Sequence, residues 1–212
     1  MRLLLRNLVA LAALTYWSAA AAQTSQPSVP PPGQAVATFA GGCFWCMEEA
    51  YEKVAGVSSV VSGFMGGTVP NPTYKQVSGG STGHAEVVQV TFDPAKVSYQ
   101  QLVDWFWVNI DPADASGQFC DKGSEYRSGI FFHGEEQKQI AQASKEKLQA
   151  SGKLKQPVAT EITPAGAFYT AEDYHQDYYK KSAARYQYYK YGCGRAARLE
   201  QIWGKPTPPP TQ

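Results

Sequence analysis

The chain has 212 residues, with 19 lysines and arginines against 18 aspartates and glutamates, and its formal net charge is +1. Because no stretch concentrates basic residues, the charge pattern gives no indication of a nucleic-acid-binding protein. The length suits one domain with a substantial core, and an aromatic content of 13% predicts that this core is well filled. The sequence shows no internal repeat and no second domain.

Residues 1–34 are predicted to lie outside the fold. Two arginines precede an apolar run at residues 8–22, which ends in alanines. This order predicts a secretory signal peptide over residues 1–22, cleaved after Ala22, and therefore a protein that is periplasmic or secreted. The run of 15 residues is shorter than the roughly 20 that span a bilayer, which disfavours a membrane anchor. Residues 23–34, rich in serine, glutamine and proline, are expected to form a linker.

A strand-to-helix turn holds the first candidate for chemistry. A short apolar strand at residues 36–40 leads into Gly41-Gly42-Cys43-Phe44-Trp45-Cys46, and apolar residues then recur at helical spacing until Gly56. The unpaired N–H groups and the dipole at a helix start favour thiolate over thiol, so Cys43 is a candidate nucleophile. On helical geometry the Cα atoms of Cys43 and Cys46 lie about 5 Å apart, within reach of a disulfide. The pair can therefore cycle between dithiol and disulfide.

The order of the next elements indicates the fold class. After the first strand and helix we expect a strand at 57–64, a strand at 86–92, a helix at 99–110 and a strand at 126–133. Long glycine-rich or polar segments at 65–83 and 111–125 separate several of them. Strand, helix, strand, strand, helix, strand is the order of a ferredoxin-like α+β fold, a split β-α-β core whose helices cover one face of an antiparallel sheet.

The second half is predicted to add C-terminal helices to this core. We expect an amphipathic helix at 135–150, a strand at 158–162 and a tyrosine-rich helix at 171–189. In the amphipathic helix, Ile140, Ala143 and Leu148 are expected to face inward. The proline-containing tail at 205–212 is expected to be disordered. The folded catalytic domain is therefore predicted over residues 35–204.

Short motifs further along the chain give the cysteine turn a chemical meaning. In chain order they are Asn71-Pro72-Thr73-Tyr74, Gly83-His84-Ala85-Glu86, Cys120-Asp121-Lys122-Gly123-Ser124-Glu125-Tyr126-Arg127-Ser128 and Ala171-Glu172-Asp173-Tyr174-His175-Gln176. Together with Gly-Cys-Phe-Trp they resemble the peptide methionine sulfoxide reductases of the A class, over residues 36–204. Several motifs in this order are far more specific than any one of them.

A site for methionine sulfoxide needs an aromatic wall for the methyl group and hydrogen-bond donors for the oxygen. The resemblance implies that Phe44 and Trp45 form this wall and that Tyr74 and Tyr126 donate from their hydroxyl groups. It also implies that Glu86, when buried and protonated, gives a proton to the departing oxygen. Without their motifs, such tyrosines are typical packing residues and such a glutamate is typically solvated.

The resemblance also implies the course of the reaction. Cys43 attacks the sulfoxide sulfur of the S epimer, methionine leaves, and Cys43 becomes a sulfenic acid. Asp121 binds backbone groups of the substrate or holds the hydrogen bonds of the site, while Asp173 and His175 line its edge. Because the electrons come from thiols, we expect no cofactor or metal, and re-reduction by thioredoxin or a thioredoxin-like protein. We expect a monomer without stable membrane association, acting on free or protein-bound methionine sulfoxide.

The sequence leaves the resolving cysteine open. Many family members have glycine where this chain has Cys46, and many carry their recycling cysteines in a glycine-rich C-terminal tail. Cys46 lies next to Cys43 and is our first choice, and Cys193, between two glycines, is the second. In an exported protein, Cys120 and Cys193 are also candidates for a structural disulfide. Cys120 either lies near the site through its neighbour Asp121 or is simply buried.

Two other classes of function compete with the reductase hypothesis. A thioredoxin-type thiol-disulfide oxidoreductase also uses an exported Cys-x-x-Cys at a helix start, but this chain lacks the helix and strand that precede that motif. A non-catalytic secreted module held by disulfides would have all four cysteines oxidised. That module would leave the Gly-His-Ala-Glu motif unexplained.

Overall fold

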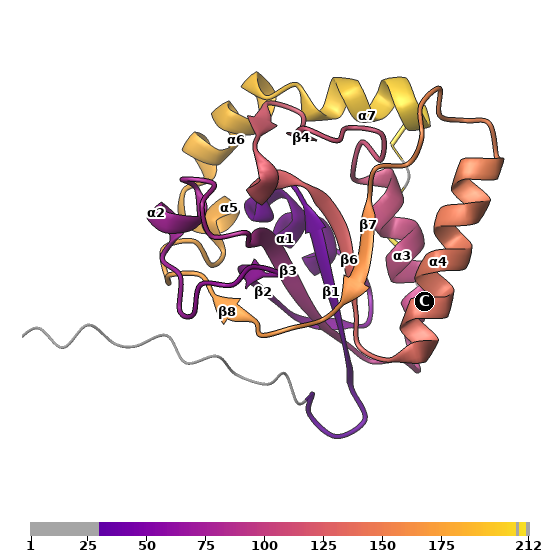
Figure 1. Ribbon diagram of the computed structural model, residues 1–212, viewed down its shortest axis with the longest axis horizontal. Coiled ribbons are helices and arrows are strands. Elements are labelled where there is room, and N and C mark those ends of the chain that lie inside the picture. The colour runs from indigo at the N-terminus through magenta and orange to yellow at the C-terminus, as the bar shows by residue number, and fades with distance from the viewer. Residues whose placement is uncertain (1–29, 207, 211–212) are drawn as a thin grey trace, which may run out of the picture.

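The structure is a computed structural model that describes residues 30–206 and 208–210 (Figure 1). The predicted signal peptide and most of the predicted linker lie outside the described residues, so cleavage and export stay predictions. Within the described part of the chain, no helix is both long and apolar enough to cross a membrane. In the tail, which the sequence predicts to be disordered, the carbonyl of Pro210 accepts a hydrogen bond from the backbone N–H of Ala55 at 3.3 Å.

A six-stranded sheet forms the centre of the protein, in the order β7-β6-β1-β3-β2-β8. Its strands are β1 (Ala35–Gly41), β2 (Val57–Met65), β3 (Ala85–Phe92), β6 (Ser128–Phe132), β7 (Glu161–Pro164) and β8 (Tyr169–Thr170). The inner strands are antiparallel, with Phe39 of β1 opposite both Val88 and Ile130, and β7 pairs in parallel with β6. The order β6-β1-β3-β2 is that of a split β-α-β core, so the predicted ferredoxin-like α+β fold is confirmed.

Helices lie against the sheet, and α6 and α7 run along the top of the molecule in Figure 1. They are α1 (Phe44–Glu52), α2 (Tyr74–Val77), α3 (Tyr99–Val108), α4 (Glu135–Ala150), α5 (Tyr178–Lys181), α6 (Ala183–Gly192) and α7 (Arg195–Trp203), with a 3-10 turn at Ser124–Tyr126. A separate ribbon pairs β4 (Gly117–Gln118) with β5 (Asp121–Lys122). Ser98 begins α3 and Thr73 begins α2, each in a capping box with the glutamine three residues later.

Two hydrophobic clusters bury both faces of the sheet. On the helical face, Phe39 stacks on Tyr51 of α1 and Phe106 of α3, with ring centroids 4.9 and 5.4 Å apart. On the other face, Phe168 belongs to a cluster with Met65 and other strand residues. The two sets alternate along the strands because successive strand residues point to opposite faces. The start of α1 therefore lies against a sheet that is buried on both faces.

The predicted helix at 171–189 is wrong. The chain leaves β8, turns at residues 173–177 and continues as two separate helices, α5 and α6. The side chain of Gln176 accepts the backbone N–H of Ser62 and donates to its carbonyl, so this segment lies beside β2 instead of coiling. Asp177 then has φ of 54°, a left-handed conformation that interrupts a right-handed helix.

Smaller differences concern α4 and β7. The bounds of α4 are as predicted, but Ala143 is exposed, and Ala141 and Ser144 are the buried residues. The hydroxyl of Ser144 accepts a hydrogen bond from the indole N–H of Trp107 at 2.7 Å, which explains a polar residue on the inner side. The strand predicted at 158–162 begins later, as β7.

Candidate active site

Cys43 occupies the turn between β1 and α1 as the N-cap residue of α1. Two glycines permit this turn. Gly42 has φ of 78°, and a Cβ atom there would lie 2.5 Å from the Cβ atom of Gln118. A Cβ atom at Gly41 would lie 2.5 Å from the sulfur of Met47. The backbone approaches its neighbours more closely than a residue with a side chain allows, and Cys43 is thereby placed at the end of a buried strand.

A small pocket of about 60 Å³ opens at Cys43. Its lining comes from several segments that are far apart in the chain: Cys43, Phe44, Trp45, Tyr74, Glu86, Asp121, Tyr126 and Tyr189. The structure therefore brings together the predicted nucleophile, wall, hydroxyl donors, acid and Asp121. Tyr189 is the member absent from the predicted set, because one tyrosine among 13 outside the motifs carries no signal of its own.

Glu86 lies on β3 and is only 2% exposed. Its Oε2 atom accepts the backbone N–H of Phe44 at 3.0 Å, which ties it to the first turn of α1. Burial raises the pKa of Glu86 well above its ordinary value, and the hydrogen bond from Phe44 opposes this only in part. The raised pKa favours the protonated acid, which is the form able to give a proton to a bound oxygen.

Tyr74 and Tyr126 bring hydroxyl groups to the same pocket from two loops. Tyr74 begins α2, where its backbone N–H donates to the carboxylate of Glu172 at 2.9 Å. Tyr126 ends the 3-10 turn that precedes β6. Burial raises the pKa of Tyr74 to about 12, and it raises the pKa of Tyr126 as well. Both hydroxyls stay protonated at neutral pH, so both can donate hydrogen bonds to a sulfoxide oxygen.

Phe44 and Trp45 form an aromatic wall that His175 supports. The indole Nε1–H of Trp45 donates to Nδ1 of His175 at 3.1 Å, and the imidazole centroid lies 5.0 Å from that of Phe44. Burial lowers the pKa of His175 to about 4, so the ring is neutral and can accept this bond. His175 contacts the wall rather than lining the pocket, and Asp173, predicted beside it, is exposed and outside the lining.

Cys43 and Cys46 are both reduced, and each is 5% exposed. Burial raises the pKa of Cys43 well above its ordinary value, and Cys46 and Glu86 raise it further. The hydrogen bond from Cys43 lowers the pKa of Cys46 to about 6, and the Arg195 guanidinium also lowers it, against the effect of burial. Of the two thiols, Cys46 is therefore the one that loses its proton more readily. The helix start favours a thiolate at Cys43, whereas burial of the side chain raises its pKa, so the two effects oppose each other.

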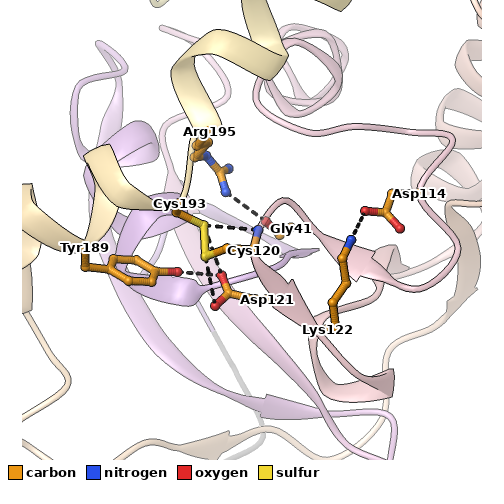
Figure 2. The surroundings of a disulfide bond; sticks show 8 residues. All are labelled: Gly41, Asp114, Cys120, Asp121, Lys122, Tyr189, Cys193 and Arg195. Atoms are coloured by element: carbon orange, nitrogen blue, oxygen red, sulfur yellow. Dashed lines mark hydrogen bonds and ion pairs between the residues drawn. A yellow bond between two sulfur atoms is a disulfide. The ribbon is translucent and has the colours of Figure 1, made fainter.

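Cys120 and Cys193 form a disulfide that joins positions 73 residues apart (Figure 2). Cys120 lies in the turn of the β4–β5 ribbon, and Cys193 is the C-cap residue of α6. In this state Cys193 is not free to attack a sulfenic acid. Since Cys43 and Cys46 are thiols, the module with four oxidised cysteines does not match the structure.

Two groups of described side chains come close enough together to hold a metal ion. They are Cys120, Asp121 and Cys193, and Glu48, Glu52 and Asp177. Both sulfurs of the first group belong to the disulfide, and Glu52 of the second group accepts hydrogen bonds from Tyr179 and pairs with Lys180. Neither group offers a free set of ligands to the pocket at Cys43.

Comparison with known proteins identifies the family. The family model described as peptide methionine sulfoxide reductase matches residues 35–207. The peptide methionine sulfoxide reductase MsrA of Listeria monocytogenes is 54% identical over 167 residues, which cover 79% of this chain and 94% of the relative. The chain belongs to the peptide methionine sulfoxide reductases.

Solved structures of two proteins share the fold of this reductase. Methionine sulfoxide reductase A of Corynebacterium diphtheriae matches with a TM-score of 0.64 and 36% identity, over 71% of this chain and 76% of that chain. Mxr1 from Saccharomyces cerevisiae in reduced form matches with a TM-score of 0.67 and 34% identity, over 72% and 88%. Mxr1 has also been solved in complex with Trx2, where the match has a TM-score of 0.50 at 25% identity, over 70% and 88%. The reductase converts methionine sulfoxide to methionine, and the thioredoxin-type alternative is set aside.

Proposed function

We propose that this reductase acts on the S epimer of methionine sulfoxide, with Cys43 as the attacking thiol and Cys46 as the resolving thiol. The pocket at Cys43 is the observation that carries the proposal. Its volume of about 60 Å³ suits the end of one side chain, and a sulfur, an aromatic wall, two hydroxyl donors and a buried acid surround that space. The preference for the S epimer rests on membership of the A class.

Substrate binding uses the two sides of this pocket. The methyl group packs against Phe44 and Trp45, and its removal from water favours binding. The sulfoxide oxygen accepts hydrogen bonds from the hydroxyls of Tyr74 and Tyr126, which are in place before the charge on the oxygen grows. Asp121, which lines the same pocket, is available to backbone N–H groups of the substrate.

The chemical step moves one oxygen atom and two protons. Cys43 attacks the sulfoxide sulfur while its own proton passes to the Cys46 thiolate, which already accepts a hydrogen bond from it. The attack joins the sulfur of Cys43 to the substrate sulfur, and Glu86 gives its proton to the oxygen. The oxygen then passes as a hydroxyl group from the substrate sulfur to the sulfur of Cys43, the bond between the two sulfurs breaks, and methionine leaves. Cys43 retains the oxygen as a sulfenic acid.

Cys46 then closes the cycle of the enzyme. Its sulfur attacks the sulfenic sulfur of Cys43, the hydroxyl leaves with the proton from Cys46 as water, and a disulfide forms. Two thiols have supplied the two electrons that reduce the sulfoxide. Cys46 is favoured over Cys193 because its backbone N–H already donates to the carbonyl of Cys43 at 3.1 Å, while Cys193 is bonded to Cys120.

A thioredoxin-like dithiol protein is the proposed electron donor. The solved complex of Mxr1 with Trx2 supports this class of partner. Export is supported by the signal-peptide pattern at residues 1–22. In that case the donor acts outside the cytosol, and we propose that the reductase works there as a monomer. N-terminal sequencing of the mature protein tests export, and an intact Met1 in the soluble fraction contradicts it.

Reduction of each sulfoxide epimer, driven by dithiothreitol, tests the main proposal. We expect reduction of the S epimer by the wild-type enzyme and none by the Cys43→Ser variant. Activity of that variant equal to wild type would remove Cys43 from the mechanism. Equal rates on both epimers would contradict the stereochemical part alone.

Peptide mapping after one turnover without reductant tests the resolving step. We expect a new bond between Cys43 and Cys46 with the Cys120–Cys193 bond intact. A bond between Cys43 and Cys193, with Cys46 still a thiol, would reverse the ranking. The matched control is the same protein mapped before sulfoxide is added.

A further inference from the structure

We propose that the Cys120–Cys193 disulfide, called the clamp below, stays outside the catalytic cycle and positions Tyr189 and Asp121 over Cys43. The inference rests on the proposed role of Cys43 as the attacking thiol. It makes Cys120 and Cys193 positioning residues rather than members of the dithiol that turns over.

The clamp lies directly beside a hydrogen bond in the active-site pocket (Figure 2). The hydroxyl of Tyr189 donates to Oδ2 of Asp121 at 2.5 Å, and both side chains line the pocket at Cys43. Asp121 follows Cys120 in the chain, and Tyr189 is one helical turn before Cys193. The disulfide therefore joins the two backbone segments that carry this pair.

A third contact joins the same two segments. Arg195, two residues after Cys193, lies with its guanidinium carbon 4.5 Å from the ring centroid of Phe119. The guanidinium is buried and donates to the carbonyls of Gly41 and Asn109. Three contacts thus join the two segments, and the covalent clamp lies between the other two. The hydrogen bond from Tyr189 to Asp121 is on one side of it, and the contact between Arg195 and Phe119 is on the other.

The two segments bury few hydrophobic side chains of their own. β4 and β5 have two residues each, and in α6 the buried residue is Tyr186. Two other tyrosines of α6, Tyr188 and Tyr191, are 83% and 90% exposed. Hydrophobic burial therefore contributes little to the position of the β4–β5 ribbon and α6. A disulfide between positions 73 residues apart restrains both segments instead.

Tyr189 affects Cys43 through its single hydroxyl proton. In the resting protein this proton goes to Asp121. Tyr189 lines the same pocket as Cys43 and lowers the thiol pKa, against the larger opposing effect of burial. The other titratable groups around Cys43 are Cys46 from α1, Glu86 from β3, Tyr74 from α2, Asp121 from β5 and Tyr126 from the 3-10 turn. Cys46 and Glu86 raise the pKa of Cys43, so Tyr189 is the contact that favours negative charge on the attacking sulfur.

The clamp also makes the site sensitive to the redox state of its surroundings. Cys120 is exposed and Cys193 is half-buried, so the bond is open to attack by a thiolate. A dithiol reductant transfers two electrons and two protons to it, which leaves two thiols on the protein and a disulfide on the reductant. The pocket is then less ordered, and the reductase works at its full rate only where the clamp stays oxidised.

The test compares three variants in single-turnover formation of methionine, so that re-reduction of the enzyme plays no part. We expect Tyr189→Phe to lower the rate about tenfold, as for one lost hydrogen bond to a charged group. The double variant Cys120→Ser, Cys193→Ser is expected to lower the rate by about the same factor. The triple variant, which combines Tyr189→Phe with the double variant, is expected to lower the rate no further than either does alone. Tyr188→Phe, on the exposed side of the same helix, is the matched control and keeps the wild-type rate.

A second readout separates positioning from simple loss of stability. The pH profile of Cys43 alkylation, followed on its own peptide, is expected to move to higher pH by the same amount in Tyr189→Phe and in the double variant. Should the double variant fail to fold, wild-type protein with the clamp opened by a titrated dithiol replaces it in both assays.

Several results would overturn the clamp. One is an unchanged rate in the double variant or in wild-type protein whose clamp has been reduced. Another is a triple variant whose rate falls by the product of the factors for Tyr189→Phe and the double variant. The third is a Cys43–Cys193 bond after one turnover. Failure of the proposed function is a separate result, because there Cys43→Ser itself stays active.

Discussion

The two cysteine pairs of this reductase differ in nearly every physical respect. Cys43 and Cys46 are three residues apart, buried and reduced, whereas Cys120 and Cys193 are 73 residues apart, nearer to solvent and bonded. A disulfide within one helical turn restrains little additional chain when it forms, while a bond between distant segments restrains both of them. Close spacing therefore suits a bond that opens in every cycle, and distant spacing suits a bond that holds a site together.

The largest predicted effect separates the two pairs directly. Cys46→Ser is expected to lower steady-state turnover with a dithiol protein by roughly 100-fold, because no neighbouring thiol converts the sulfenic acid to a disulfide. One methionine per enzyme still forms, which a burst experiment measures. Cys193→Ser is expected to keep turnover within about tenfold of wild type, since it loses positioning alone. The reverse order of the two variants would break the comparison.

The acid that serves the first pair is the next target. Glu86→Gln keeps an acceptor for the N–H of Phe44 but has no acidic proton, so we expect single-turnover methionine formation to slow by about 100-fold. Because burial raises the pKa of Glu86, the wild-type rate is expected to fall as the pH rises through that raised value. The variant is expected to lack this decline. An identical pH profile in both proteins would show that Glu86 is not the proton donor. As a control, the Cys120–Cys193 disulfide must be intact in both proteins.

The charge within the first pair predicts an order of reactivity. At pH 7 Cys46, with its pKa lowered to about 6, is expected to be alkylated more than tenfold faster than Cys43, whose pKa burial raises. Iodoacetamide labelling across pH, with mass spectrometry of each peptide, measures both profiles. Unfolded protein is the control, in which the two thiols are expected to be alkylated with the same pH dependence. Faster labelling of Cys43 at pH 7 would place the resting thiolate on the other sulfur.

The smallest predicted effect concerns the helix that carries the first pair. Burial raises the pKa of Glu48 to about 7 from an ordinary value of 4.5. Its folded-state pKa lies above the unfolded one, so its contribution to stability is full below about pH 4.5 and is lost as the pH rises through 7. Glu48→Gln retains acceptors and donors for Ser62 and the N–H of Asp177.

We therefore expect this variant to exceed wild type in free energy of unfolding by about 1–2 kcal/mol at pH 8 and to match it near pH 5. Urea unfolding at the two pH values provides the measurement. An equal difference at both would show that ionisation of Glu48 is not its cause.

Local patterns predicted most of the elements. The helix at 135–150 has the predicted bounds because its apolar residues repeat at helical spacing and glycine precedes it. The helix at 171–189 failed because the decisive contacts are distant, since Gln176 bonds to the backbone of Ser62, 114 residues away. Tyr189 was missed for the same reason. Its importance comes from the residues that it meets, Asp121 and Cys43, and not from its neighbours in the chain.

The sequence by itself determined the parts whose chemistry is local or recorded in a motif. The turn at Cys43 and the roles proposed for Phe44, Trp45 and Glu86 belong to this class. Tertiary structure decided which of the two buried thiols has the lower pKa and that Cys120 bonds to Cys193. The contact between the thiols, burial and Arg195 set the first, and the meeting of two distant segments sets the second. Electrostatics and cross-links depend on distances in space, which short spacings in a sequence do not contain.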